Sequence, residues 1–282
     1  MSTIHATDAA QELADDQARA ERVAALRRRR AALNNFGIRM VSLAIFLGIW
    51  QLAAMNVDPV LFTSPWKVAV AAVGMIASGE LWAGLWPSLL VLMMGLTLAV
   101  IFGTLLGLAL ARFHVLDVGL TVYITFLYSI PSVALVPLIV LWAGYETTAK
   151  VIILFLFAFF PMVINTYQGV KSVDPKLLEV GRAFRCSEGQ LWWNIVLPAA
   201  LPFIVTGLRL ALGRALIGMV LADLYTAISG IGYLIVRTAS TFQVDKMFVP
   251  IVTLGLLGVT LTALLRLAER HVAPWTAASQ ED

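Results

Sequence analysis

The side chains that could do chemistry in this 282-residue chain form two small groups. One group lies in an apolar segment, where Arg214 and Asp223 carry charge. A charge at the centre of a bilayer costs at least about 2.5–3.5 kcal/mol, so we expect Arg214, near mid-membrane, to be paired, hydrated or in contact with a ligand, whereas Asp223 lies near the outer end. The other group is a polar insert at 178–202, which carries Glu179 and Arg182 between long apolar segments. These residue types favour binding of an ion or of a partner protein.

Neither group has the composition of an enzyme active site. No Ser/His/Asp set and no pair of acids shares one face, so we expect no catalytic residue. The single cysteine, Cys186, and three scattered histidines offer no metal-ligand spacing. The sequence also lacks a G-x-x-x-x-G-K-S/T phosphate loop, so we expect no ATP site and no cofactor bound by this chain.

The composition predicts an all-α polytopic membrane protein. Sixty per cent of the residues are hydrophobic and 13% are charged, against about 25% charged in soluble domains. A net charge of +3 is better explained by basic loops beside anionic lipid than by nucleic acid. We therefore expect membrane lipid as a partner and no nucleic acid.

Apolar runs of about 20 residues predict six membrane spans. The expected spans cover 36–55, 88–111, 116–142, 150–170, 202–225 and 247–267. The run at 67–77 is too short, so we expect a helix on the membrane surface there. The domain organisation is a tail at 1–35, a membrane domain at 36–270 with a polar loop at 171–201, and a tail at 271–282. The first tail is expected to be solvated, with a lipid-surface helix as the alternative.

The distribution of basic residues predicts the orientation. With the N-terminus inside, the inner loops hold most of the Lys and Arg, including Arg27–Arg30 and Lys171. The opposite orientation would reverse this bias, which contradicts the positive-inside rule. We expect both termini and the polar loop to be cytoplasmic.

The polar loop carries the signals of two short helices. Asp174 before Pro175 is typical of a helix start, and a helix through about Phe184 is expected. Ser187 and Gln190 form a capping box that starts a second helix through about Trp193. Two prolines, at 198 and 202, predict a break before the fifth span. For the tandem Trp192–Trp193, contact with a partner and anchoring at the membrane interface both remain open.

Two further patterns concern the spans themselves. Small residues recur every fourth position in 99–111 and in 207–215, which favours close helix packing without identifying the partner. Pro131 and Pro137 predict bends in the third span, and Pro161 in the fourth. Bent helices either line a pathway or serve packing alone, and the sequence does not separate these readings.

Residues 179–198 resemble the EAA loop of bacterial ABC-importer permeases. The family pattern is E-A-A-x-x-x-G, nine residues, then I-x-L-P, and the residues at its defined positions are Glu179, Val180, Gly181, Arg185, Ile195, Leu197 and Pro198. Val180 and Gly181 replace the alanines. Arg185 stands in place of the glycine and takes a left-handed turn less readily. Residues 130–144 and 197–222 resemble the nitrate/sulfonate/taurine branch, and the resemblance extends from about 61 to 267.

The resemblance implies a type I ABC importer permease fold of six transmembrane helices with a coupling-helix loop. It implies a transport subunit rather than an enzyme, in the bacterial inner membrane. The implied partners are a second permease copy, two ABC ATPase subunits that bind ATP-Mg, and a periplasmic or lipid-anchored solute-binding protein. The implied substrate is a small anion such as a sulfonate, taurine or nitrate. The residues implied in coupling to the ATPase are Glu179, Val180, Gly181, Arg182, Arg185, Ile195, Leu197 and Pro198.

The expected lining of the translocation pathway is Tyr128, Ser129, Ser132, Arg214 and Asp223. Arg214 lies about 17 Å along the fifth helix from Phe203, near mid-membrane. Either it binds an anionic substrate, or it is structural and bonds to carbonyls or a carboxylate. Asp223 could contact the binding protein, cap a neighbouring helix or line the outer gate. The alternative function is an ion-coupled secondary transporter, which the lone acid and the lack of an internal repeat disfavour.

Overall fold

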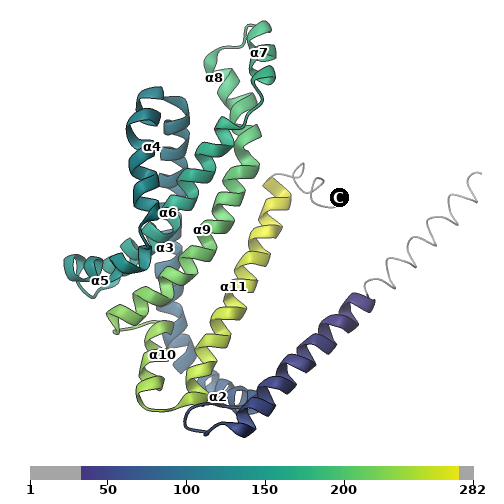
Figure 1. Cartoon of the computed structure of the whole chain (residues 1–282), viewed down its shortest axis with the longest axis vertical. Coiled ribbons are helices and arrows are strands. Elements are labelled where there is room, and N and C mark those ends of the chain that lie inside the picture. Colours follow the sequence, from purple (N-terminus) through teal and green to yellow (C-terminus); the bar gives the residue numbers. More distant parts are fainter. Residues whose placement is uncertain (1–32, 273–282) are drawn as a thin grey trace, which may run out of the picture. The chain divides into compact units, whose positions relative to one another are not determined.

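The computed structural model describes residues 33–272, and the regular structure within this range is helical (Figure 1). The chain divides into two compact units, Met1–Pro65 and Trp66–Asp282. The expected tail at 1–35 lies almost wholly outside the described residues, as does most of the tail at 271–282.

The described part of the first unit is one apolar helix and the turns after it. The helix covers Leu33–Asn56 and is long enough to cross a membrane, which confirms the first expected span. After it, the Trp50 indole N–H donates to the carbonyl of Thr63 over 2.8 Å. This bond folds the following turn back onto the helix end.

The second unit consists of ten α-helices and one π-helical turn within its described residues. Their bounds are α2 Pro65–Ala77, α3 Glu80–Arg112, α4 His114–Ser129, α5 Ser132–Ala143, α6 Thr147–Lys171, α7 Pro175–Ala183, α8 Glu188–Leu191, the π-helical turn η1 Trp192–Val196, α9 Leu197–Thr226, α10 Ile231–Ser240 and α11 Val244–Val272. Figure 1 shows α7 and α8 at one end of this unit and α10 at the opposite end.

Helices α3, α6 and α9 form the centre of the unit and approach each other at glycines. A Cβ added at Gly103 of α3 would lie 2.6 Å from the Cβ of Met162 in α6. A Cβ at Gly207 of α9 would lie 2.9 Å from the Cβ of Asn165, again in α6. The small-residue patterns therefore serve packing within the chain, and their common partner is α6.

The third expected span is broken rather than kinked. Helices α4 and α5 meet at an angle of 94° around Ile130 and Pro131. Ile130 is extended, as helical backbone is disfavoured for a residue before proline, and Pro131 has no N–H to continue the helix. Pro137, in contrast, is accommodated inside α5. Within residues 33–272, five helices are long and apolar enough to cross a membrane, and the count reaches six if the bent pair is one span.

Three other expectations about boundaries need correction. Helix α3 begins at Glu80, eight residues before the expected start, and includes Pro87 in its interior. No break occurs at Pro198 and Pro202, because α8, η1 and α9 continue as one helix, Glu188–Thr226. The π-helical turn ends at Val196, two residues before Pro198, whose nitrogen cannot donate a hydrogen bond. Helix α10 was not expected, since its ten residues are too few to register as a span.

Candidate functional site

The polar loop folds as two short helices, and local capping defines the first of them. The carboxylate of Asp174 accepts a hydrogen bond from the N–H of Lys176 over 2.9 Å, and Pro175 occupies the first turn. Helix α7 then runs to Ala183, one residue short of the expected end at Phe184. Its side chains Glu179, Val180 and Arg182 are exposed.

Helix α7 ends in a Schellman motif whose left-handed residue is Arg185. The N–H of Cys186 donates to the carbonyl of Gly181 over 3.0 Å, and the N–H of Arg185 donates to that of Arg182 over 2.9 Å. Arg185 has φ of 57°, so it adopts the backbone that the family pattern assigns to glycine. The turn between the two helices is therefore kept despite the substitution.

The capping box predicted for the second helix is confirmed. The Ser187 hydroxyl accepts from the N–H of Gln190, and the Gln190 side chain accepts from the N–H of Ser187. Helix α8 is only four residues long, but η1 extends it without interruption into α9. Leu197 and Pro198 therefore lie inside a continuous helix.

Gly181 is where the two helices cross. A Cβ added there would lie 2.4 Å from a methyl carbon of Leu191 and 2.9 Å from the end of Ile195. Gly181 is buried, whereas its neighbours Val180 and Arg182 are exposed. The crossing thus brings Gly181 and Ile195 into contact although they lie fourteen positions apart in the sequence.

The tandem tryptophans have different environments. Trp193 is 73% exposed. Trp192 is partly buried, and the guanidinium carbon of Arg112 lies 5.4 Å from its ring centroid. Phe184, directly after α7, is also exposed. This end of the unit therefore exposes both aromatic and charged side chains on a pair of crossed helices.

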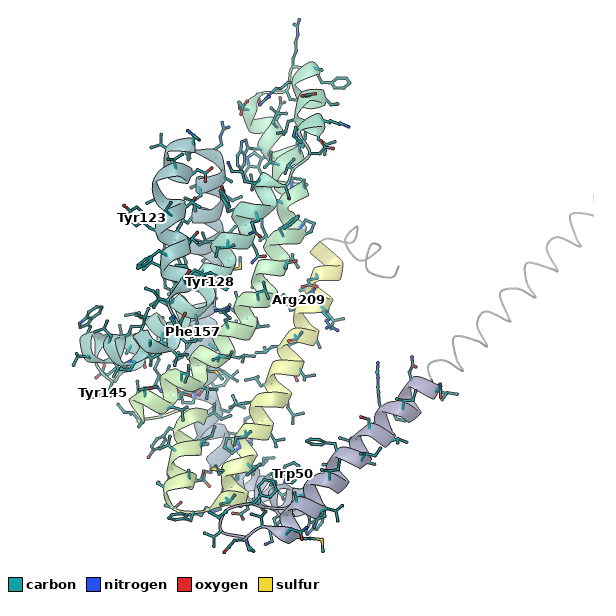
Figure 2. All side chains as sticks on the ribbon, in the orientation of Figure 1. Trp50, Tyr123, Tyr128, Tyr145, Phe157 and Arg209 are labelled. Carbon is teal, nitrogen blue, oxygen red and sulfur yellow. The ribbon has the colours of Figure 1, made fainter. Side chains whose placement is uncertain are left out.

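The structure brings together Arg214 and Tyr128, two of the residues expected to line a pathway. A guanidinium N–H of Arg214 donates to the Tyr128 hydroxyl over 3.1 Å, and the guanidinium carbon lies 5.2 Å from the ring centroid. Tyr128 and Arg209 are labelled in Figure 2, where the sticks show their places along the unit. Among the described residues, no carboxylate pairs with Arg214, whereas Arg209 pairs with Glu269 over 2.6 Å.

The two serines expected beside this pair stand on either side of the helix break. The Ser129 hydroxyl donates to the carbonyl of Thr125 over 2.8 Å and ends α4. Ser132 begins α5 and is half-buried. Both serines lie within four residues of Tyr128 in the sequence. The backbone between them, at Ile130 and Pro131, is not helical.

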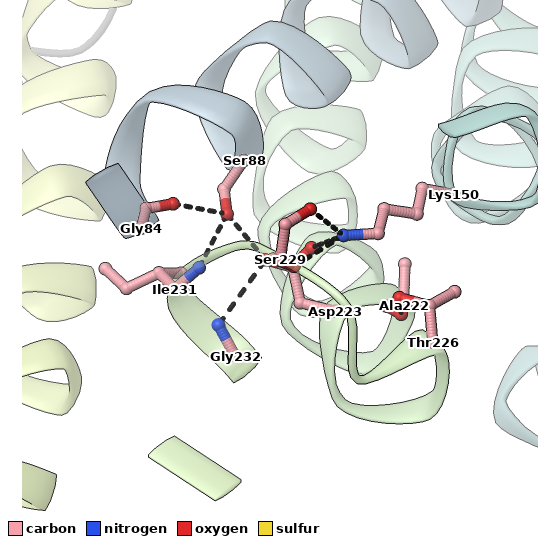
Figure 3. Close-up of polar contacts among 9 residues, drawn as sticks. All are labelled: Gly84, Ser88, Lys150, Ala222, Asp223, Thr226, Ser229, Ile231 and Gly232. Atoms are coloured by element: carbon pink, nitrogen blue, oxygen red, sulfur yellow. Dashed lines mark hydrogen bonds and ion pairs between the residues drawn. The ribbon is translucent and has the colours of Figure 1, made fainter. Parts of the chain in front are cut away.

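Asp223 lies in the interior of the unit, at the centre of a polar network (Figure 3). Its carboxylate accepts from the Lys150 ammonium over 2.7 Å, from the Ser88 hydroxyl, and from the N–H of Gly232 over 3.4 Å. The side chains of Lys150 and Asp223 are only 4% and 2% exposed. Of the three roles considered for Asp223, the geometry fits capping of a neighbouring helix, α10, and this buried position offers no surface to a pathway.

The remaining bonds of the network complete the connection of α10 to the helix bundle. Lys150 also donates to the carbonyl of Ser229 over 2.6 Å, and the N–H of Ile231 donates to the Ser88 hydroxyl over 2.8 Å. Gly230 has φ of 110°, and a Cβ there would lie 2.2 Å from the Asp223 carboxylate. Sequence reasoning missed Lys150 because, at the end of a span, it had the ordinary signature of a flanking charge.

Comparisons with known proteins agree with these features. The family model described as "Binding-protein-dependent transport system inner membrane component" matches residues 99–277. The chain is 32% identical over 234 residues to the putative aliphatic sulfonates transport permease protein SsuC of Bacillus subtilis (strain 168), covering 82% of this chain and 85% of that protein. It is 29% identical over 241 residues to the taurine transport system permease protein TauC of Escherichia coli (strain K12), covering 83% and 88%.

Among solved structures, the chain is similar to a crystal structure of an amino acid ABC transporter with histidines. The TM-score is 0.52 at 20% sequence identity, and the match covers 71% of this chain and 98% of that chain. At this identity the likeness concerns the fold alone.

The buried ion pair generates a first prediction. Lys150→Met leaves the Asp223 carboxylate buried without its cation, which costs about 3–5 kcal/mol. We expect a lower thermal unfolding midpoint of the purified chain in detergent. The double variant Lys150→Met/Asp223→Leu removes both charges and should regain part of the loss. An unchanged midpoint for the single variant would show that the pair is not needed for stability.

The strained turn generates a second prediction. Arg185→Gly removes an L-residue from left-handed backbone, a conformation that costs roughly 1–2 kcal/mol, and part of the gain is offset by the greater freedom of glycine in the unfolded chain. We expect slower amide exchange at 184–190. Arg185→Ala is the matched control, because it removes the charge but keeps the Cβ, and it should not slow exchange. Equal slowing in both variants would assign the effect to charge.

Proposed function

The chain belongs to the family of binding-protein-dependent transport system inner membrane components and has the fold of type I ABC-importer permeases, and we propose that it forms the translocation pathway of an ATP-driven importer as a dimer of permease chains. It is a transport subunit rather than an enzyme. ATP-Mg binds to two partner ATPase subunits that contact the polar loop, and a periplasmic or lipid-anchored solute-binding protein delivers the substrate. The complex lies in the bacterial inner membrane.

The observation that carries this proposal is the construction of the loop. Helices α7 and α8 are capped by their own side chains and pressed together at Gly181, so they move as one body. Helix α8 continues through η1 into α9 without a flexible joint. A partner that pushes on the loop therefore displaces α9 directly, because a rigid element moves as a whole between two conformations.

The proposed contact surface for the ATPase is the exposed side of the loop. Glu179, Val180 and Arg182 supply charge and apolar area along α7, while Gly181 and Ile195 hold the helices together. Arg185 sets the turn, and Leu197 and Pro198 carry the displacement into α9. The basic residues of this end and the positive-inside rule support a cytoplasmic position for the loop and for both termini.

The proposed substrate is a small anion such as a sulfonate, taurine or nitrate. Arg214 supports this choice, because it carries a full charge in the middle of α9. Its guanidinium has five N–H donors, and the bond to Tyr128 uses one of them. A guanidinium with free donors matches the oxygens of a sulfonate. Two similar proteins are named for aliphatic sulfonates and for taurine. Tyr128, Ser129 and Ser132 would line the same region beside the helix break.

The acid considered for the alternative, an ion-coupled secondary transporter, is Asp223, and its position does not suit ion exchange. Coupling through a carboxylate requires an acid that can exchange its ion. Asp223 is held by Lys150 and by α10 in the interior of the unit, where it is 1% exposed. The importer remains the function that the geometry supports.

Charge reversal at the loop tests the coupling role. Glu179→Arg should reduce ATP-dependent solute uptake at least tenfold in liposomes holding the permease, the ATPase subunits and the binding protein, because like charge replaces a complementary contact. The matched control is Glu146→Arg, an exposed acid on the loop before α6, and it should retain uptake. Wild-type uptake by Glu179→Arg would contradict the coupling role.

Substitution of the mid-membrane arginine tests the substrate class. With taurine or an alkanesulfonate as solute, Arg214→Met should lower uptake at least tenfold, and Arg214→Lys should retain more activity because it keeps the charge without the planar fork. Tyr128→Phe removes only the hydroxyl acceptor and should have a smaller effect. ATP-driven uptake of an anion that is unaffected by Arg214→Met would place the anion's path elsewhere.

A further inference from the structure

A second connection between the polar loop and the bundle runs through Arg112, the last residue of α3. A guanidinium N–H donates to the carboxylate of Glu188 over 3.0 Å, and the guanidinium carbon lies 5.4 Å from the ring centroid of Trp192. Glu188 begins α8 and Trp192 begins η1, so both partners belong to the loop end of the long helix. Arg112 lies 76 residues earlier in the chain.

The two partners of Arg112 are set on one face by the first turn of the long helix. The N–H of Trp192 donates to the carbonyl of Glu188, which is the hydrogen bond of a regular helical turn. Residues four apart therefore lie on the same side of the helix, which makes the side chains of Glu188 and Trp192 neighbours. Glu188 also lies at a helix N-terminus, where the backbone dipole favours a negative charge. A guanidinium can thus meet a carboxylate and an aromatic face at once.

The connection matters because the chain itself joins the loop to only two helices. The loop leaves α6 at Lys171 and continues into α9. Helix α3 has no covalent link to it, yet α3 packs against α6 through Gly103 and Gly107. Without Arg112, displacement of the loop would reach the inner end of α3 only through the packing of α3 against α6 and α9. With Arg112, α3 is attached to the loop directly.

We propose that Arg112 is a positioning residue that makes the inner end of α3 follow the loop, so that α3, α6 and α9 move together when the ATPase subunits push. This inference rests on the proposed function for its consequence in transport. The contact of Arg112 with Glu188 and Trp192, called the tie below, does not rest on it, because this contact lies within one chain. Its strength comes from the pairing of two interactions, since an exposed ion pair alone stabilises little and the partly buried indole fixes the guanidinium in place.

The chain offers a matched control at the opposite end of the same helix. Arg237 of α10 pairs with Glu80, the first residue of α3, over 3.6 Å. This pair is also an exposed arginine with a glutamate, and it also holds α3, but it lies away from the loop. Arg112→Gln and Arg237→Gln therefore remove the same kind of interaction from the two ends of one helix.

Two measurements separate the tie from its role in transport. In the purified permease alone, hydrogen exchange of the peptide covering 187–196 should become at least threefold faster in Arg112→Gln and remain unchanged in Arg237→Gln. In the reconstituted complex, the solute taken up per ATP hydrolysed should fall at least threefold in Arg112→Gln and stay within error in Arg237→Gln. The exchanged pair Arg112→Glu/Glu188→Arg should restore the ratio to within twofold of wild type.

The outcomes are distinct. Wild-type exchange and a wild-type transport ratio in Arg112→Gln would overturn the proposal, and so would equal losses in both glutamine variants, which would indicate general weakening of α3. Should Arg112→Gln fail to assemble, Glu188→Gln breaks the same pair from the loop side and carries the same expectation. Absence of ATP-driven uptake by the wild-type complex would overturn the proposed function, while the exchange measurement would still decide whether the tie exists.

Discussion

Helices α3, α6 and α9 lie so close that a single added carbon at several glycines would collide with a neighbouring helix, and the rest of the unit depends on this close approach. The Cβ positions at Gly95, Gly103 and Gly107 all fall within 2.7 Å of side-chain carbons of α6. Lipid provides no hydrophobic drive between helices, so van der Waals contact must hold them, and contact requires that the backbones come near. Helix α6 lies between the other two and packs against both.

Charge is handled in two opposite ways within this apolar unit. Lys150 and Asp223 are removed from solvent and lipid together, with every group of the pair bonded, and their network joins α10 to α3, α6 and α9. Such a pair is costly to break, because the partner left behind would be buried without compensation. Arg214 instead keeps its charge on a face of α9, with a tyrosine as its neighbour. The first arrangement suits a structural role, and the second suits the binding of a ligand with negative charge.

The polar loop is stiff for reasons that lie mostly in its own residues. Asp174, Ser187 and Gln190 satisfy the free N–H groups at the helix starts, and the Schellman motif at Arg185 satisfies the carbonyls at the end of α7. The continuous helix through η1 then carries the loop into the membrane-spanning part. A stiff loop that continues into a long helix transmits its displacement to that helix. Coupling to a separate ATPase subunit requires this property.

The sequence by itself determined the helical class, the apolar spans, the capping of the loop helices at Asp174 and Ser187, and the family. These features depend on composition, on runs of apolar residues and on contacts within four positions, all of which can be seen without knowing the fold. The tertiary structure decided which distant residues meet. Lys150 and Asp223 are 73 positions apart, and Tyr128 and Arg214 are 86 apart. The structure also decided whether the span breaks or bends at Pro131 and whether Arg185 adopts left-handed backbone, because the local preference in each case allows more than one conformation.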